Sequence, residues 1–95
     1  MRDPDGRIRD IGWRYIQLAR QRHYHEGFND DQLHEIGLGI AHNVDVSLYA
    51  NREFYASQMW IIRLGLEEGV DVTSYAKPEY SCFKMEEMLI EILDS

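Results

Sequence analysis

The sequence SQMWIIRLGLEEGVDVTSYA, residues 57–76, decides the fold because most of it occurs twice. The segment QLHEIGLGIAHNVDVSLYA (residues 32–50) matches QMWIIRLGLEEGVDVTSYA (residues 58–76) at a constant offset of 26 positions. A third, half-length copy follows, in which Tyr80 takes the place of Phe28 and Phe54. Self-similarity at a fixed short period is the sequence signature of a repeat architecture. We therefore predict that the chain is built from small repeated units.

Each full copy is predicted to contain a long helix followed by a short one. Apolar residues recur at positions 33, 36, 38 and 40 of the first copy and at the equivalent positions of the second. This spacing gives a helix two apolar sides, which suits packing between two neighbours. Gly39 and Gly65 lie at the same place inside these helices, where glycine costs about 0.5–1 kcal/mol relative to alanine. We expect the close approach of a neighbouring helix to offset this cost.

Residues typical of helix caps separate the predicted helices. Gly69, and Asn43 in the first copy, suit the left-handed position after the long helix, and each is followed by a valine. Short polar side chains then suit the first position of each helix. The predicted N-caps are Asn29 or Asp30, Asp45, Ser57 and Asp71.

The first 27 residues lie outside the repeats and are predicted to form one further helix. Its apolar stripe has a 3-4-3 spacing and consists of Ile8, Ile11, Tyr15 and Leu18. We expect this helix to run from Arg7 to about Tyr24 and to stop near Gly27, after a frayed start at residues 1–6 with Asp5-Gly6 as a turn.

The predicted fold is therefore all-α: an N-terminal helix plus two and a half 26-residue helix–turn–short-helix repeats. Ninety-five residues make a single domain. The repeats are expected to form a solenoid-like stack or a small bundle. The units are residues 1–27, 28–53, 54–79 and 80–95.

The charge of the chain is distributed unevenly. Residues 1–25 contain six arginines and three aspartates, a net charge of +3, whereas residues 26–95 contain four basic and fourteen acidic side chains, a net charge of −10. The acidic part should repel phosphates and attract basic surfaces. The sequence contains no apolar run long enough to span a membrane and no signal peptide. A lone Cys82 suits a reducing cytosol, so we expect a cytoplasmic protein.

No titratable residues are spaced for catalysis or metal binding, so we expect no enzyme activity, catalytic residue, metal or cofactor. The histidines at 23 and 25 are two positions apart, and those at 34 and 42 are eight apart, which does not match the clustered spacing of zinc ligands. Two pairs of adjacent carboxylates, Asp30-Asp31 and Glu67-Glu68, would need a cleft that separates their pKa values before they could act as acid and base.

The basic N-terminal helix offers a possible nucleic-acid contact. Its basic face consists of Arg7, Arg9, Arg14, Arg20 and Arg22. Nucleic-acid-binding domains are usually basic overall, and this chain has a net charge of −7. We therefore expect these arginines to face solvent, the acidic repeats or a partner, and direct nucleic-acid binding remains the third reading of the sequence.

Residues that break the repeat pattern are the candidates for partner binding. Tyr55, Trp60 and Ile61 are bulky, whereas the other copies have mostly polar residues at these positions: Asn29, His34, Glu35, Ser81, Glu86 and Glu87. Exposed aromatic residues are typical anchors of protein interfaces. The alternative is that Trp60 packs into the core against the N-terminal helix. We also assign the acidic pair Glu67 and Glu68 to the predicted partner surface.

The repeat resembles a tandem repeat of bacterial phage and mobile-element proteins, with a consensus close to QMxxIxLGLxxGxDVSxYAxPxF. The resemblance covers residues 28 to about 93, and the first copy departs from it with Asn43 for glycine and Asn51-Arg52 for Lys-Pro. The positions that match in the second copy are Gln58, Met59, Ile62, Leu64, Gly65, Leu66, Gly69, Asp71, Val72, Tyr75, Ala76 and Pro78.

The resemblance implies phage or mobile-element cargo acting inside a bacterial cell, without a settled activity. Together with the acidic charge, it favours a non-enzymatic inhibitor or regulator of a host nucleic-acid enzyme, of the anti-CRISPR or antirestriction type, acting as a nucleic-acid mimic. The alternative is a structural or assembly module that self-associates.

Overall fold

The computed structural model describes residues 4–22, 24 and 27–94, with side chains from residue 13 onward. Within these ranges every regular element is a helix, which confirms the all-α prediction. The elements are α1 (Pro4–Gln21), α2 (Asp30–Ala41), the 3-10 turn η1 (Val46–Leu48), α3 (Ala56–Glu67), the 3-10 turn η2 (Val72–Ser74) and α4 (Cys82–Asp94).

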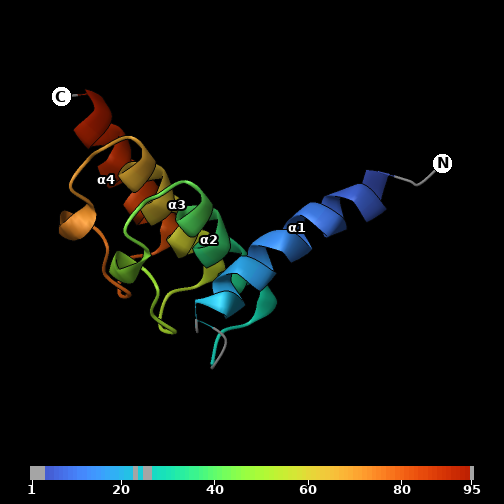
Figure 1. Cartoon of the computed structure of the whole chain (residues 1–95). Coiled ribbons are helices and arrows are strands. Elements are labelled where there is room, and N and C mark those ends of the chain that lie inside the picture. Colours follow the sequence, from blue (N-terminus) through green and yellow to red (C-terminus); the bar gives the residue numbers. More distant parts are fainter. Residues whose placement is uncertain (1–3, 23, 25–26, 95) are drawn as a thin grey trace.

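Each α-helix packs against the next one along the chain (Figure 1). Helices α2, α3 and α4 lie side by side, and the 3-10 turns flank them. The C-terminal part of α1 packs on α2, while its N-terminal part extends away from the other helices. The molecule is accordingly elongated, with extents of 46 × 30 × 22 Å.

Equivalent positions of the two full copies form the same buried contacts. Tyr49 and Tyr75 are fully buried, and their hydroxyls donate hydrogen bonds to the carbonyl oxygens of Glu35 (2.6 Å) and Ile61 (3.0 Å). Burial raises the pKa of Tyr75 to about 12 and that of Tyr49 further. Each tyrosine thereby ties a 3-10 turn to the helix that precedes it.

The recurrent glycines make room for these tyrosines. A methyl group on Gly39 would overlap the Tyr49 hydroxyl, and one on Gly65 would overlap the Tyr75 hydroxyl. The prediction that a neighbouring helix approaches these glycines is therefore wrong, because the 3-10 turn of the same copy occupies that space. The close helix contact is at Gly37 instead, where a side chain would overlap the backbone of Tyr15 in α1.

Several predicted caps are confirmed. Asn29 caps α2 in a reciprocal capping box with Gln32, and Asp45 and Asp71 accept hydrogen bonds from the backbone N–H groups two residues further on. Asn43 and Gly69 have positive φ angles of 61° and 79°. The following valines, Val44 and Val70, donate to the carbonyls of Gly39 and Gly65, which closes each helix in a Schellman motif.

The bounds of α1 differ from the prediction. The helix begins at Pro4, so Asp5-Gly6 is helical and not a turn; proline suits the first helical position because the N–H group that it lacks would have no partner there. The helix ends at Gln21, before the predicted Tyr24. Gly27 has a φ of 79° but does not cap α1, and the Arg52 side chain occupies the space where its own would lie.

Candidate functional site

The structure separates the three residues predicted to form one exposed cluster. Tyr55 is 76% exposed and Trp60 is 45% exposed, whereas Ile61 is 3% exposed. Ile61 belongs to the hydrophobic core, so its predicted place on an accessible surface is wrong. An apolar residue replaces glutamate there because the position is buried in α3. Trp60 lies on the surface, contrary to the alternative that placed it in the core.

Tyr55 occupies the N-cap position of α3. The equivalent residues are Asn29 and Ser81, and both accept a hydrogen bond from the N–H group three residues on. No side chain at the cap accepts such a bond in α3; the Gln58 side chain accepts one from the Tyr55 N–H (2.6 Å). The predicted cap Ser57 is wrong, because it lies one residue inside the helix. Tyrosine thus stands where the other copies have a stabilising cap.

A hollow of about 290 Å³ lies beside Tyr55, between the N-terminal ends of α3 and α4. Phe83, which is 77% exposed, lies on its α4 side. The intervening loop contributes Pro78, Glu79 and Tyr80. Two strongly exposed aromatic rings therefore flank a hollow whose remaining lining is partly apolar and includes one carboxylate.

Phe83 escaped the sequence-based prediction although the same signal marks it. It aligns with Asp31 and Ser57, so it breaks the repeat pattern from polar to aromatic just as Tyr55 does. The sequence-based prediction covered departures in the second copy alone, and Phe83 lies in the third. We name Tyr55, Phe83 and the loop 78–80 the aromatic hollow.

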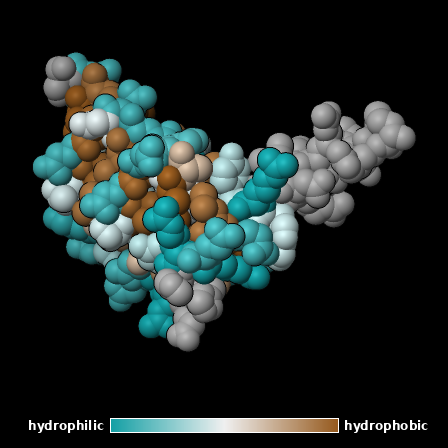
Figure 2. All heavy atoms as spheres, in the orientation of Figure 1, coloured by the Kyte–Doolittle hydropathy of each residue, from teal (hydrophilic) through white to brown (hydrophobic). Residues whose placement is uncertain are grey.

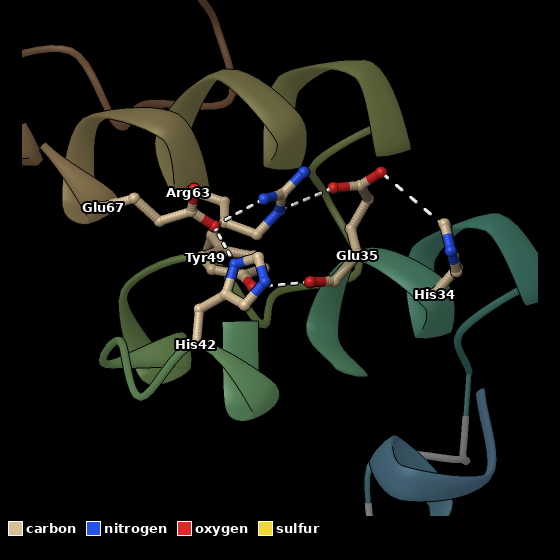
Figure 3. A network of polar contacts seen from close by, with 6 residues as sticks. All are labelled: His34, Glu35, His42, Tyr49, Arg63 and Glu67. Atoms are coloured by element: carbon tan, nitrogen blue, oxygen red, sulfur yellow. Dashed lines mark hydrogen bonds and ion pairs between the residues drawn. The ribbon is translucent and has the colours of Figure 1, made fainter. Parts of the chain in front are cut away.

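The acidic pair of the predicted site has divided roles. Glu68 is exposed. The Glu67 carboxylate instead belongs to a polar network between α2 and α3 (Figure 3), where it accepts a hydrogen bond from Arg63 (2.5 Å) and pairs with the His42 ring (2.5 Å). Arg63 also donates to Glu35 (3.0 Å). His34 lies 3.9 Å from Glu35 and packs edge-on against the Tyr15 ring of α1.

Arg63 is the centre of this network, which we name the Arg63 clasp (Glu35, His42, Arg63 and Glu67). The Arg63 side chain is only 8% exposed. Burial lowers its pKa, but the hydrogen bonds to Glu67 and Glu35 outweigh this effect and hold the pKa above its ordinary value. Burial likewise raises the pKa of Glu67, and the hydrogen bonds from His42 and Arg63 more than reverse this, so that the pKa is lowered. The lowered pKa keeps the Glu67 carboxylate charged and paired with Arg63, which suits a link between helices.

The basic face of α1 is placed only in part. Arg14, Arg20 and Arg22 are exposed. Arg20 pairs with Asp30 at 3.7 Å and lies over the Trp13 ring at 5.4 Å, so this arginine faces the start of the repeats. The side chains of Arg7 and Arg9, like His23 and His25, lie outside the described residues.

Two features of the described residues bear on other classes of function. They contain no group of three or more histidine, cysteine or acidic side chains arranged to hold a metal ion. No helix among them is both long and apolar enough to cross a membrane. No protein-family model, curated protein sequence or solved structure matches the chain.

Proposed function

We propose that this protein is a non-enzymatic module that binds another protein through the aromatic hollow. The observation that carries the proposal is Tyr55, an exposed tyrosine at a helix N-cap. Replacing a capping side chain costs about 0.5–2 kcal/mol, and an exposed aromatic ring recovers little of this by burial. Folding gives no reason for tyrosine at this position, whereas an interface anchor does.

The surroundings of Tyr55 support the same function. Phe83 on the other side of the hollow and Trp60 on α3 are also exposed, and aromatic side chains are enriched at the energetic centres of interfaces. Figure 2 shows hydrophobic side chains running between hydrophilic ones across one face of the helix stack. An apolar patch with a polar rim is the usual layout of a protein-binding surface.

The partner that best fits the charge is a basic protein, and we propose a host enzyme that acts on nucleic acids. Residues 26–95 carry a net charge of −10, which suits a surface built for phosphates. Glu68 is available for such a contact, whereas the charge of Glu67 is already compensated in the Arg63 clasp. With the resemblance to the phage repeat, this makes the protein an inhibitor of the anti-CRISPR or antirestriction type, acting in the bacterial cytoplasm.

We also propose that residues 28–95 form a short solenoid of two and a half repeats. Helices α2, α3 and α4 begin at Asp30, Ala56 and Cys82, 26 residues apart each time. The buried glutamines support the same periodicity: Gln32 donates to the carbonyls of residues 52 and 54, and Gln58 to those of residues 78 and 80. Each repeat would thus anchor the start of the next.

Capture of a partner from a lysate of the host cell tests the proposal. The immobilised parent chain is compared with Tyr55→Asn, which installs the residue of the first copy, and with Phe83→Ser, which installs that of the second. We expect both variants to fold and to lose most of the partner that the parent retains. The matched control is Glu53→Gln, a change of an exposed loop residue outside the hollow.

The purified partner then distinguishes specific binding from background. We expect the parent chain to bind it and to inhibit its nucleic-acid chemistry, and Tyr55→Asn to do neither. Equal retention by the parent and by both aromatic variants would remove the hollow from the interface.

A further inference from the structure

The contact between α2 and α3 shows how one repeat meets the next. Two side chains of α2 reach α3: Glu35 accepts a hydrogen bond from Arg63 (3.0 Å), and His42 pairs with Glu67 (2.5 Å). Residues 31, 35, 38 and 42 follow a 4-3-4 spacing, so they form one stripe on the helix. We name this stripe the forward stripe, because its members at 35 and 42 contact the following helix.

Helix α4 carries a forward stripe that no following helix covers in the described chain. Its members, 52 positions after those of α2, are Phe83, Glu87, Ile90 and Asp94. All four are exposed, with Phe83 77% and Ile90 51% exposed. Glu87, at the place of Glu35, makes a long contact of 4.0 Å to the exposed Lys84 of its own helix and pairs with no arginine among the residues that the structure describes. The stripe alternates apolar and acidic side chains.

The α2–α3 contact indicates what this stripe would accept. At the contact of α2 with α3, Glu35 meets the cation Arg63. The equivalent positions one repeat further on are occupied by Ile61 in α3 and Leu89 in α4, and both of these residues are buried. The first pair of positions thus holds two opposite charges, whereas the equivalent pair holds two apolar residues. Glu87 therefore calls for an arginine on the opposing helix, with apolar surface beside it for Phe83 and Ile90.

Helix α1 offers these features on its outer side. Tyr15 and Ala19 lie on the side that packs on α2, so Trp13 and Arg14 lie on the opposite half of the helix. Arg14 is exposed and Trp13 is 50% exposed. The charges are complementary, because residues 1–25 carry a net charge of +3 and residues 81–95 contain one lysine and four acidic residues.

We infer that copies of this chain associate head to tail, with the outer side of α1 of one copy on the forward stripe of α4 of the next. Arg14 and Glu87 form the charge pair of this contact, and Trp13 covers Ile90 or Phe83. Because Phe83 also lines the aromatic hollow, this contact and the proposed partner compete for that side chain. The two surfaces are different, so the contact is heterologous and adds further copies unless the rotation closes a ring. One helix face buries little area, so the association is weak and sensitive to salt.

Sedimentation velocity of the full chain tests the inference. At low salt, the mean sedimentation coefficient of the parent should rise with protein concentration up to about 1 mM, the range in which weak interfaces form. Both Glu87→Arg and Arg14→Glu should weaken the association at least about tenfold, since each places like charges opposite one another. Circular dichroism of each variant confirms that the exposed substitutions leave the helices intact.

A mixture of the two variants gives the decisive result. In an equal mixture, the unchanged α1 of the Glu87→Arg variant can bind the unchanged α4 of the Arg14→Glu variant, and the two substituted surfaces carry opposite charges as well. The two variants should therefore alternate and associate about as strongly as the parent. The double variant Arg14→Glu/Glu87→Arg should associate as the parent does. The inference is overturned if the parent stays monomeric, if the mixture does, or if Arg14→Glu alone associates like the parent, as a symmetric α4–α4 pair would.

Discussion

Tyr55 shows how a repeat separates the requirements of folding from those of function. Asn29 and Ser81 show which side chains the helix start prefers, since both cap their helices through a side-chain oxygen. Tyr55 lacks that bond and is 76% exposed. The other copies thus supply substitutions that should improve folding and impair binding, a combination that a structural role would not produce.

We expect Tyr55→Asn to raise the free energy of unfolding by about 0.5–1 kcal/mol, because the asparagine oxygen can accept from the Gln58 N–H as Asn29 does from Gln32. Urea denaturation of both proteins measures this difference. Asn29→Ala is the control and should lose about 0.5–2 kcal/mol. A loss of stability in Tyr55→Asn would mean that the tyrosine ring contributes to the fold.

At Gly65 the expected effect has the opposite sign. A methyl group there would overlap the Tyr75 hydroxyl and lie 2.8 Å from a Val72 methyl, so Gly65→Ala should cost about 1–3 kcal/mol. Tyr75→Phe removes the overlapping oxygen but also its bond to the Ile61 carbonyl. The loss in the free energy of unfolding of the double variant should therefore be at least about 1 kcal/mol smaller than the sum of the losses in the two single variants. Additive losses would show that the Tyr75 hydroxyl is not the reason why position 65 requires glycine.

Among the elements, the pair α2 and α3 depends on the Arg63 clasp. Arg63→Ala would leave the Glu35 and Glu67 carboxylates close together without their shared cation, and we expect a loss of about 2–4 kcal/mol in the free energy of unfolding. Arg63→Met keeps the length of the side chain but not its charge, so it should be almost as destabilising. Thermal unfolding at neutral pH measures both, and a midpoint unchanged in either variant would contradict the role of the clasp.

The clasp should also make stability depend on acidity. The pKa of Glu67 is lowered from its ordinary 4.5 in the folded protein, so its contribution is complete above the pKa of the unfolded chain and is lost as the pH falls through the folded-state pKa. Stability measured from neutral pH to about pH 3 should therefore fall less steeply in Glu67→Gln than in the parent. Glu68→Gln removes the same charge outside the clasp and should keep the slope of the parent.

The sequence predicts what the copies share better than what distinguishes them. The caps at Asp45 and Asp71 and the turns at Asn43 and Gly69 recur, and each was identified from its recurrence and the side-chain chemistry of caps. The Arg63 clasp has no such signal, because Gly37 and Leu89 occupy the same position in the other copies. Its members come together only when α2 packs on α3. Ile61 was misplaced for a related reason, since departure from the repeat marks a changed neighbour as readily as a free surface.

At the scale of the whole molecule, charge and shape divide the chain in the same place. The basic α1 extends from one side of the stack, and the acidic repeats form the rest. A field of this kind acts at a distance, so it changes the rate at which a partner arrives more than the lifetime of the complex. The aromatic hollow acts at contact and should mainly determine that lifetime.

The partner retained by the aromatic hollow should therefore associate more slowly as salt rises. Screening shortens the reach of the field from about 10 Å at 0.1 M salt to about 3 Å at 1 M, while a largely apolar contact dissociates at a similar rate. At fixed salt, Glu68→Lys should slow association and Lys84→Glu should speed it, because both exposed residues alter the field without touching the Arg63 clasp. Tyr55→Asn should act oppositely, with faster dissociation and little change in association. Surface plasmon resonance resolves the two rates, and an association rate that is flat in salt and equal in both charge variants would exclude mimicry of a nucleic acid.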